Sequence, residues 1–355
     1  MLVKMKGPKL FFFIVISLMG ECYSQDIHFS QFYETPSLLN PAMIGVTNKL
    51  RASLQYKNQW SSVTVPYKTF AASIEMRFNQ NNSEKNTSPG LIRNLSGGIS
   101  VISDKAGDGD MGLLLATFSL ASRVSLDDNN AISAGLQAGI VQRSINYDKL
   151  IFPNQYTGSG YDPNYNSGES FNATKFSYGD FAAGLLWTYG RGEMYMSAND
   201  EFKANAGISL YHVSQPKEKF LSNVIETLKM RFLIHGGMLI GIPNSNLDIA
   251  PSFIVNRQGK SDEIVLGTLF KYQLREDSKY TGYIKSAIIS LGGYYRTGDA
   301  IIPTVLFEIG QYALGLSYDV NVSALKAASS YRGGIEISLR FVGVNPFLFQ
   351  NKSRF

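Results

Sequence analysis

Residues 331–341 read Tyr-Arg-Gly-Gly-Ile-Glu-Ile-Ser-Leu-Arg-Phe. Every second side chain from Ile335 to Leu339 is apolar, and Glu336 and Ser338 stand between them. A β-strand points successive side chains to opposite faces, so this stretch predicts a strand with one apolar and one polar face. It is about twice the usual length of a strand in a soluble sheet, and it matches a strand that crosses a bilayer at a tilt.

The same alternation recurs along the chain. Leu50 to Lys57 and Tyr67 to Phe78 show it most clearly after the closing stretch. Fourteen strands are predicted, at 50–58, 67–78, 95–103, 111–124, 130–146, 176–189, 202–213, 229–242, 246–257, 262–273, 282–296, 301–308, 310–320 and 331–341. An even number of long alternating strands is typical of closed outer-membrane barrels. The sequence therefore predicts an all-β, transmembrane antiparallel β-barrel.

Composition agrees with one barrel. Of the 355 residues, 44% are hydrophobic and 17% are charged, yet mean hydropathy is only -0.06. A lipid-facing apolar set and a lumen-facing polar set would average to such a value along every strand. The hydrophobic content argues against disorder, and the spread of the +5 net charge argues against a nucleic-acid-binding tract.

The N-terminus has the pattern of an export signal. Three lysines precede the apolar run Leu10 to Met19, which is too short to span a bilayer as a helix. We expect cleavage after Ser24, so that residues 1–24 form a signal peptide and the mature chain starts at Gln25. Acylation of Cys22 as a lipoprotein is the alternative, although Glu21 stands where a small residue is expected.

The remaining chain divides into three parts. Residues 25–49 are predicted to form a periplasmic or lumen-plugging segment, 50–341 the barrel and 342–355 a C-terminal tail. The block Phe29 to Ala42 is rich in Pro, Asn and aromatic residues. It is either a plain periplasmic tether or a segment that fills the lumen or docks a partner, because its aromatic side chains would otherwise be exposed.

Strand parity predicts which connections face outside. With a periplasmic N-terminus, the outer loops fall near 59–66, 104–110, 147–175, 214–228, 258–261, 297–300 and 321–330. The long polar segment Ile151 to Lys175 is then external. The segment Asn79 to Asn94 departs from the pattern, since it is long and polar but would lie on the inner side.

The sequence favours neither catalytic nor metal chemistry. The chain has three histidines, His28, His212 and His235, and a mature form without Cys22 has no thiol. A zinc site would need nearly all of these imidazoles. Ser209 and His212 are three residues apart and so lie on opposite faces of a strand, which argues against a serine hydrolase. We therefore expect no enzyme, no cofactor and no metal.

One acidic loop leaves two interpretations open. Asp104 to Asp110 carries carboxylates at alternating positions and could supply oxygen ligands to calcium. It lacks the spacing and the distal Glu of an EF-hand, and a glycine-aspartate hairpin explains it more simply.

Several blocks of sequence carry a resemblance to a known family. They are Gln25 to Phe32, Pro36, Leu39 to Ala42, Gly45, Arg51, Tyr56, Gln59-Trp60, Pro66-Tyr67, Thr69, Asp104 to Gly107, Gly135 to Gly139, Gly207 to Ser209, His212 to Pro216, Gly315 to Asp319 and Gly334 to Leu339. On these residues the chain resembles the PorP/SprF family, outer-membrane proteins of the type IX secretion and gliding machinery in Bacteroidetes.

The resemblance implies a function without catalysis. It implies an outer-membrane barrel that helps to export, retain or display a large adhesin-like surface protein, together with a periplasmic peptidoglycan-binding lipoprotein. Within these blocks, some residues are expected to contact a partner protein. They are Phe29, Ser30, Gln31, Asn40, Pro41, Trp60, Asp104, Lys105, His212, Gln215, Pro216, Tyr318 and Asp319. A passive channel for small solutes is the alternative, because fourteen strands enclose a lumen wide enough to conduct when it is empty.

Overall fold

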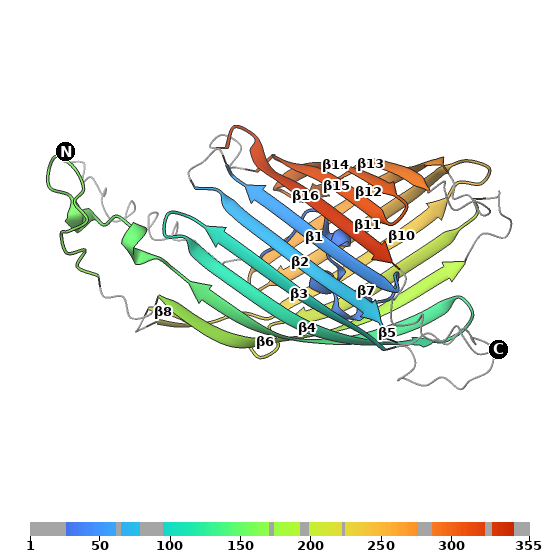
Figure 1. The fold of residues 1–355 in the computed structure, drawn as a ribbon, viewed down its shortest axis with the longest axis horizontal. Coiled ribbons are helices and arrows are strands. Elements are labelled where there is room, and N and C mark those ends of the chain that lie inside the picture. Colours follow the sequence, from blue (N-terminus) through green and yellow to red (C-terminus); the bar gives the residue numbers. More distant parts are fainter. Residues whose placement is uncertain are drawn as a thin grey trace, which may run out of the picture.

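The protein is a closed antiparallel β-barrel of fourteen strands (Figure 1). In this computed structural model, residues 26–61, 65–78, 95–169, 174–191, 199–221, 224–275, 286–323 and 329–343 are described. The expected signal peptide and the segment Asn79 to Asn94 lie outside these residues, as does nearly all of the expected tail. No helix in the described part of the chain has the length and apolar character needed to cross a membrane.

The strands follow one another around the barrel as a meander, with each neighbouring pair antiparallel. Their bounds are β1 (Leu50–Gln59), β2 (Tyr67–Arg77), β3 (Leu95–Ala106), β4 (Met111–Ser125), β5 (Asn130–Ser144), β6 (Lys175–Arg191), β7 (Phe202–Tyr211), β10 (Arg231–Gly241), β11 (Leu247–Gln258), β12 (Ser261–Arg275), β13 (Ala287–Arg296), β14 (Ala300–Ile309), β15 (Tyr312–Asn321) and β16 (Arg332–Gly343). β1 pairs with β16 from Leu50↔Gly343 to Gln59↔Gly334, which closes the barrel and leaves no long open edge.

The alternation read from the sequence has the orientation of a membrane barrel. On β16, Ile335 and Leu339 are 43% and 45% exposed on the outer wall, whereas Glu336 and Ser338 are buried inside. On β5, Leu136 and its outward neighbours are exposed in the same way. A water-soluble barrel would bury the apolar set, so this exposed apolar belt is the surface that lipid covers.

The two ends of the barrel differ. We call the end where 145–174 joins β5 to β6 the loop end, and the opposite end the turn end. Short turns such as Gly310-Gln311 join strands at the turn end. The loop end rises beside β4, β5 and β6, since residues 175–182 of β6 pair with β5 but extend beyond β7. Figure 1 shows these strands projecting beyond the rest of the barrel.

A separate two-stranded sheet stands on this raised side. β8 (Lys217–Leu221) and β9 (Val224–Thr227) form a hairpin within the connection from β7 to β10. The sequence predicted a loop over 214–228, and the structure differs. Two strands of five and four residues are too short for period-two alternation to identify them.

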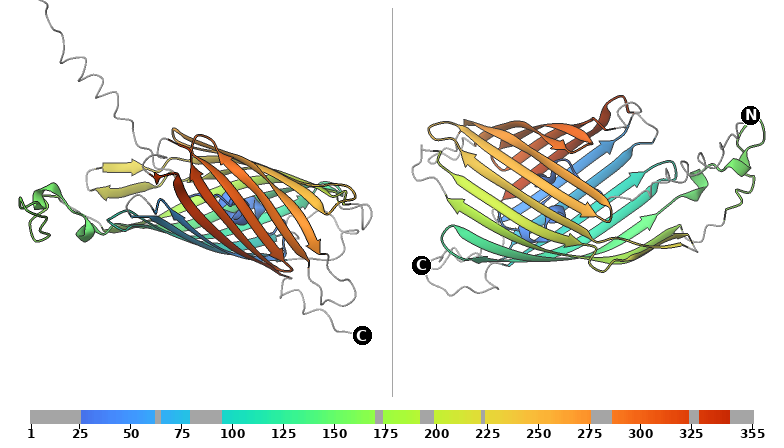
Figure 2. Two further views of the ribbon diagram at one scale, coloured as in Figure 1. Left: turned by 90° about the horizontal axis from the view of Figure 1, so that it is seen from above. Right: turned by 180° about the vertical axis from the view of Figure 1, so that it is seen from behind.

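The lumen contains the segment that precedes β1. We call Asp26 to Lys49 the lumenal strap. It comprises η1 (Phe32–Glu34), α2 (Pro36–Leu39) and η2 (Pro41–Met43), joined by irregular backbone. Both views in Figure 2 show this blue segment enclosed by the strands. Two apolar clusters hold it. One joins Phe29 to Ala71 and Ile102, and the other joins Phe32 and Leu39 to the strand residues Leu233, Ile254, Val265, Leu269, Tyr294, Ala300 and Ile302.

Candidate functional site

The strap begins at the loop end in a cluster of charged side chains. The Asp26 carboxylate contacts the His212 ring and, at 3.4 Å, the Arg231 guanidinium. The other ring nitrogen of His212 lies 3.0 Å from Asp180 on β6. The Asp26 N–H donates to the Gln258 side chain at 3.1 Å. The first strap residue is therefore fixed to β10, β11 and His212, and His212 in turn contacts β6.

These contacts set the charge of the imidazole. Burial alone would lower the pKa of His212, but the hydrogen bonds to Asp180 and Asp26 outweigh it and raise the pKa to about 9. Burial likewise works against the charged form of Asp26. The His212 hydrogen bond and the Arg231 charge nevertheless hold the Asp26 pKa well below its usual range. The pair is therefore an ion pair at neutral pH.

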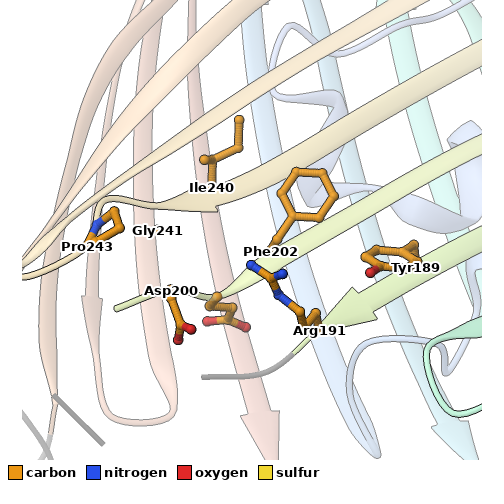
Figure 3. A pocket seen from close by; sticks show the side chains of 8 residues that line it. Tyr189, Arg191, Asp200, Phe202, Ile240, Gly241 and Pro243 are labelled. Atoms are coloured by element: carbon orange, nitrogen blue, oxygen red, sulfur yellow. The ribbon is translucent and has the colours of Figure 1, made fainter. Parts of the chain in front are cut away.

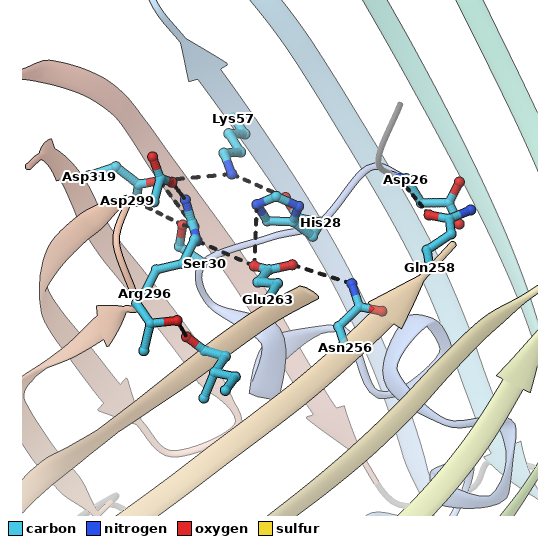
Figure 4. Close-up of polar contacts among 12 residues, drawn as sticks. Asp26, His28, Ser30, Lys57, Asn256, Gln258, Glu263, Arg296, Asp299 and Asp319 are labelled. Atoms are coloured by element: carbon cyan, nitrogen blue, oxygen red, sulfur yellow. Dashed lines mark hydrogen bonds and ion pairs between the residues drawn. The ribbon is translucent and has the colours of Figure 1, made fainter. Parts of the chain in front are cut away.

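A second cluster surrounds Arg296 of β13 (Figure 4). Its guanidinium lies 3.3 Å from Glu263, 3.2 Å from Asp319 and 2.8 Å from the hydroxyl oxygen of Ser30. Ser30 in turn donates to Asp319 at 2.7 Å. Lys57 completes the group by donating to the backbone oxygen of His28 at 3.1 Å. Strands from both sides of the lumen thus hold the strap through one network.

The middle of the strap is held through its backbone. The two Glu336 oxygens accept the N–H groups of Ser30 and Gln31, both at 2.8 Å. The Gln31 side chain donates to Ser317 at 3.1 Å and accepts from Ser338 at 2.7 Å. Irregular backbone has no strand partner to accept its N–H groups. The Glu336 carboxylate accepts two of them instead.

Further along the chain, strap residues contact the strand backbone directly at positions occupied by glycine. The Asn40 side chain donates to the backbone oxygens of Leu185 and Ile208 at 3.0 and 3.1 Å. A Cβ placed on Gly184 would lie 2.0 Å from the Asn40 amide oxygen, and one on Gly135 would lie 2.4 Å from the Ala42 nitrogen. Glycine at these inward positions therefore allows the close approach.

At the turn end, part of the lumen beside the strap is open. Arg51 and Arg340 bind the two oxygens of Glu34 at 3.0 and 2.7 Å, and Arg77 donates to the Gly45 carbonyl oxygen. A cavity of about 1130 Å³ lies between the strap and this end of the barrel. The strap thus leaves an open volume of the lumen beside it at the turn end.

Side-chain contacts also join the β8–β9 hairpin to the raised side of the loop end. Glu218 on β8 lies 3.1 Å from Arg143 on β5 and accepts from the Tyr178 hydroxyl at 3.0 Å. The connection 145–174 carries exposed aromatic rings on Tyr156, Tyr161 and Tyr165. This arrangement provides an exposed, aromatic-rich surface beside the mouth of the barrel.

The residues predicted as partner contacts fall into two groups. Buried ones contact the barrel itself: Phe29, Ser30, Gln31, Asn40 and Pro41 lie in the strap, and His212, Pro216 and Asp319 lie beneath the loop end. The others reach the surface in part or fully: Trp60, Asp104, Lys105, Gln215 and Tyr318. Contact of either group with a partner stays a prediction.

Two of these surface residues, Asp104 and Trp60, contact side chains of neighbouring residues. Asp104 accepts from the Thr69 hydroxyl at 2.6 Å, and Trp60 packs edge-on against Tyr67 with ring centroids 5.2 Å apart. In the acidic loop, Asp110 pairs with Lys149 at 2.6 Å, which joins the β3–β4 turn to the long connection.

Sequence reasoning missed the strand residues that bind the strap. Arg296 binds Ser30 of the strap, Arg51 and Arg340 bind Glu34, and none of these arginines belonged to the predicted site. A signal was present, since charged residues at inward positions such as Glu336 and Arg340 interrupt an otherwise small or polar face. Their partners in the strap could not be read from strand periodicity.

Solved structures similar to this chain are membrane barrels. The Ralstonia pickettii toluene transporter TbuX is 11% identical over 87% of this chain and 93% of its own, with a TM-score of 0.46. The monoaromatic hydrocarbon channel CymD is 9% identical over 90% and 95%, with a TM-score of 0.43. CdiB from Acinetobacter baumannii is 9% identical over 82% and 60%, with a TM-score of 0.40. No curated protein matches the sequence.

The family comparison covers most of the chain. A sequence model described as type IX secretion system membrane protein PorP/SprF matches residues 21–341. This range includes the strap, the β8–β9 hairpin and thirteen of the fourteen barrel strands completely, and it ends within β16. The resemblance read from the sequence blocks is confirmed, and the chain belongs to the PorP/SprF family of type IX secretion system membrane proteins.

Proposed function

We propose that this barrel is a non-enzymatic outer-membrane component of the type IX secretion and gliding machinery that helps to export, retain or display a large adhesin-like surface protein. The observation that carries the proposal is the strap. It holds buried ion pairs and close backbone contacts with strands on every side of the lumen. A barrel occupied in this way is suited to serve as a scaffold.

The loop end is the proposed contact surface. It carries the raised β4–β6 wall, the β8–β9 hairpin and the exposed tyrosines of 145–174. Aromatic side chains are enriched at protein interfaces because they bury a large area with little loss of conformational freedom. At the turn end, the 1130 Å³ cavity is where a periplasmic peptidoglycan-binding lipoprotein would have access to the strap.

Affinity purification from the native outer membrane tests the proposal. The intact protein is compared with a variant in which Ile151 to Gly168 is replaced by a short Gly-Ser linker. The control exchanges Asp127 for Asn in the exposed β4–β5 turn at the opposite end. A heat-dependent shift in gel mobility shows that each variant is folded.

The expected result is recovery of a very large surface protein with the intact chain and with Asp127→Asn, and its loss from the loop variant. Recovery of no such protein with the intact chain would overturn the retention function. Equal recovery of the surface protein with the intact chain and both variants would show that Ile151 to Gly168 is not the contact surface.

A further inference from the structure

The loop-end part of β6 has a neighbouring strand on one side only. Residues 175–182 pair with β5, whereas pairing with β7 starts at Ala183↔Leu210. At the turn end the two strands are still paired at Arg191 and Phe202, whose side chains Figure 3 shows. Within the described part of the chain, no strand pairs with the other edge of 175–182, which we call the open edge of β6.

Strand parity identifies the backbone groups on the open edge. The Val213 N–H donates to the Phe181 carbonyl oxygen at 3.1 Å, so odd-numbered residues in this part of β6 direct their backbone groups away from β5. The open edge therefore carries the backbone groups of Lys175, Ser177 and Gly179. Among these groups, only the Gly179 carbonyl oxygen has a partner in the described part of the chain, the Ser214 hydroxyl at 3.5 Å.

The open edge is accessible and lies beyond the apolar belt. Its three residues are exposed. Ile140 on β5 and Phe181 on β6 are 68% and 53% exposed on the lipid-facing wall. Closer to the loop end, the outward positions carry the polar pair Gln142↔Ser177 and then Lys175. The open edge therefore stands above the level that lipid covers.

The β8–β9 hairpin does not complete the sheet at this edge. Its Glu218 side chain contacts Arg143 and Tyr178, which share the lumenal faces of their strands with the buried residues Val141 and Asp180. The hairpin is therefore held on the lumenal face of the raised wall. Among the described residues, no ladder of backbone hydrogen bonds joins β8 to β6.

The chemistry of the open edge selects an extended chain. A row of unpaired N–H and C=O groups on a strand is a template for another strand, because only extended backbone matches its spacing. Lys175 adds a charge at the end of the row. It is exposed, and within the described part of the chain no carboxylate forms an ion pair with it. An acidic side chain in the added segment would complement this charge.

We propose that the open edge of β6 binds an extended segment of the large surface protein as an additional strand. The inference rests on the proposed function and adds the mode of recognition. Backbone hydrogen bonds to Ser177 and Gly179 hold the segment, and the Lys175 ammonium faces an acidic residue within it. The backbone bonds supply affinity, and the side chains of the segment supply specificity.

A proline substitution tests the backbone contact. Ser177→Pro removes the N–H at the centre of the open edge and leaves the β5 ladder intact, because that N–H points away from β5. Ser177→Ala is the matched control, since it loses the hydroxyl but keeps the N–H. Each barrel is purified from the native outer membrane with its bound surface protein, and heat-dependent gel mobility shows that it is folded.

Amide hydrogen exchange over 175–181 is measured for the intact barrel with and without the surface protein. The Ser177 and Gly179 amides are expected to exchange at least about tenfold more slowly in the complex. Ser177→Pro should lower recovery of the surface protein about tenfold, and Ser177→Ala should leave it unchanged.

Two results would overturn this inference and leave the proposed function standing. They are recovery of the surface protein without slower exchange at these amides, and equal recovery with Ser177→Pro and Ser177→Ala. Slow exchange in a dimer of the barrel alone would assign the open edge to a second copy and also overturn it. Recovery of no surface protein with the intact chain would overturn the proposed function as well.

Discussion

The carboxylate of Glu336 accepts the backbone N–H of Gln31 at 2.8 Å, although the two residues are 305 positions apart in the chain. The same carboxylate accepts the Ser30 N–H. This relationship joins the last strand to the segment before the first strand, so closure of the barrel and docking of the strap depend on each other.

Replacing Glu336 with Gln should loosen the strap. The amide keeps one acceptor oxygen but directs an NH₂ group at a backbone N–H, so one buried donor loses its partner. The expected loss of unfolding free energy is about 2 kcal/mol. Denaturant unfolding of the purified barrel measures it. Asp262→Asn, at an exposed position, should change the midpoint little; an equal loss in both variants would show that Glu336 has no special role.

A methyl group on Gly135 should displace the strap without removing any polar contact. Its Cβ would lie 2.4 Å from the Ala42 nitrogen and the Pro41 carbonyl carbon, which are backbone atoms that cannot turn aside. Overpacking of this kind costs about 1–3 kcal/mol. Gly160→Ala is the control, because no atom lies within 4 Å of its added Cβ. Thermal unfolding of the two variants checks the difference, and an unchanged Gly135→Ala midpoint would contradict this packing.

Alkaline pH should weaken the first strap contact. Burial in the folded protein lowers the pKa of His212, but the contacts with Asp180 and Asp26 outweigh burial. The pKa of His212 therefore rises from 6.5 to about 9 on folding. A raised pKa contributes stability that is fully present below pH 6.5 and is lost as pH rises through about 9. The contribution is about 3 kcal/mol at most. Unfolding midpoints between pH 6 and 10 measure it.

His212→Gln is the control for that titration, because glutamine carries no proton over this range. Its midpoint should vary less with pH than that of the intact protein. Parallel curves for the two proteins would show that His212 does not carry the alkaline loss.

The sequence was sufficient for the barrel wall. All fourteen predicted strands correspond to observed ones, most within three residues at each end, because lipid outside and polar lumen inside impose a strict period of two. The β8–β9 hairpin was missed since its strands are short. Prediction of the closing stretch 331–341 agrees with β16 (Arg332–Gly343).

The strap was only half predictable. Its aromatic and proline content indicated a buried or docking segment, and Ser30, Gln31 and Asn40 were singled out. Their partners Glu336, Arg296 and Gly184 lie far along the chain, and only closure of the barrel brings them together. Strand periodicity gives the face of each such residue but not its neighbour across the lumen.

Single-channel recording of the purified, intact barrel in a planar bilayer distinguishes a scaffold from an open channel. If the strap makes the barrel a closed scaffold, the intact chain shows no steady open conductance, and deletion of Asp26 to Gly45, which empties the lumen, produces one. A large, steady conductance from the intact protein would rule out the closed scaffold and favour a passive channel for small solutes.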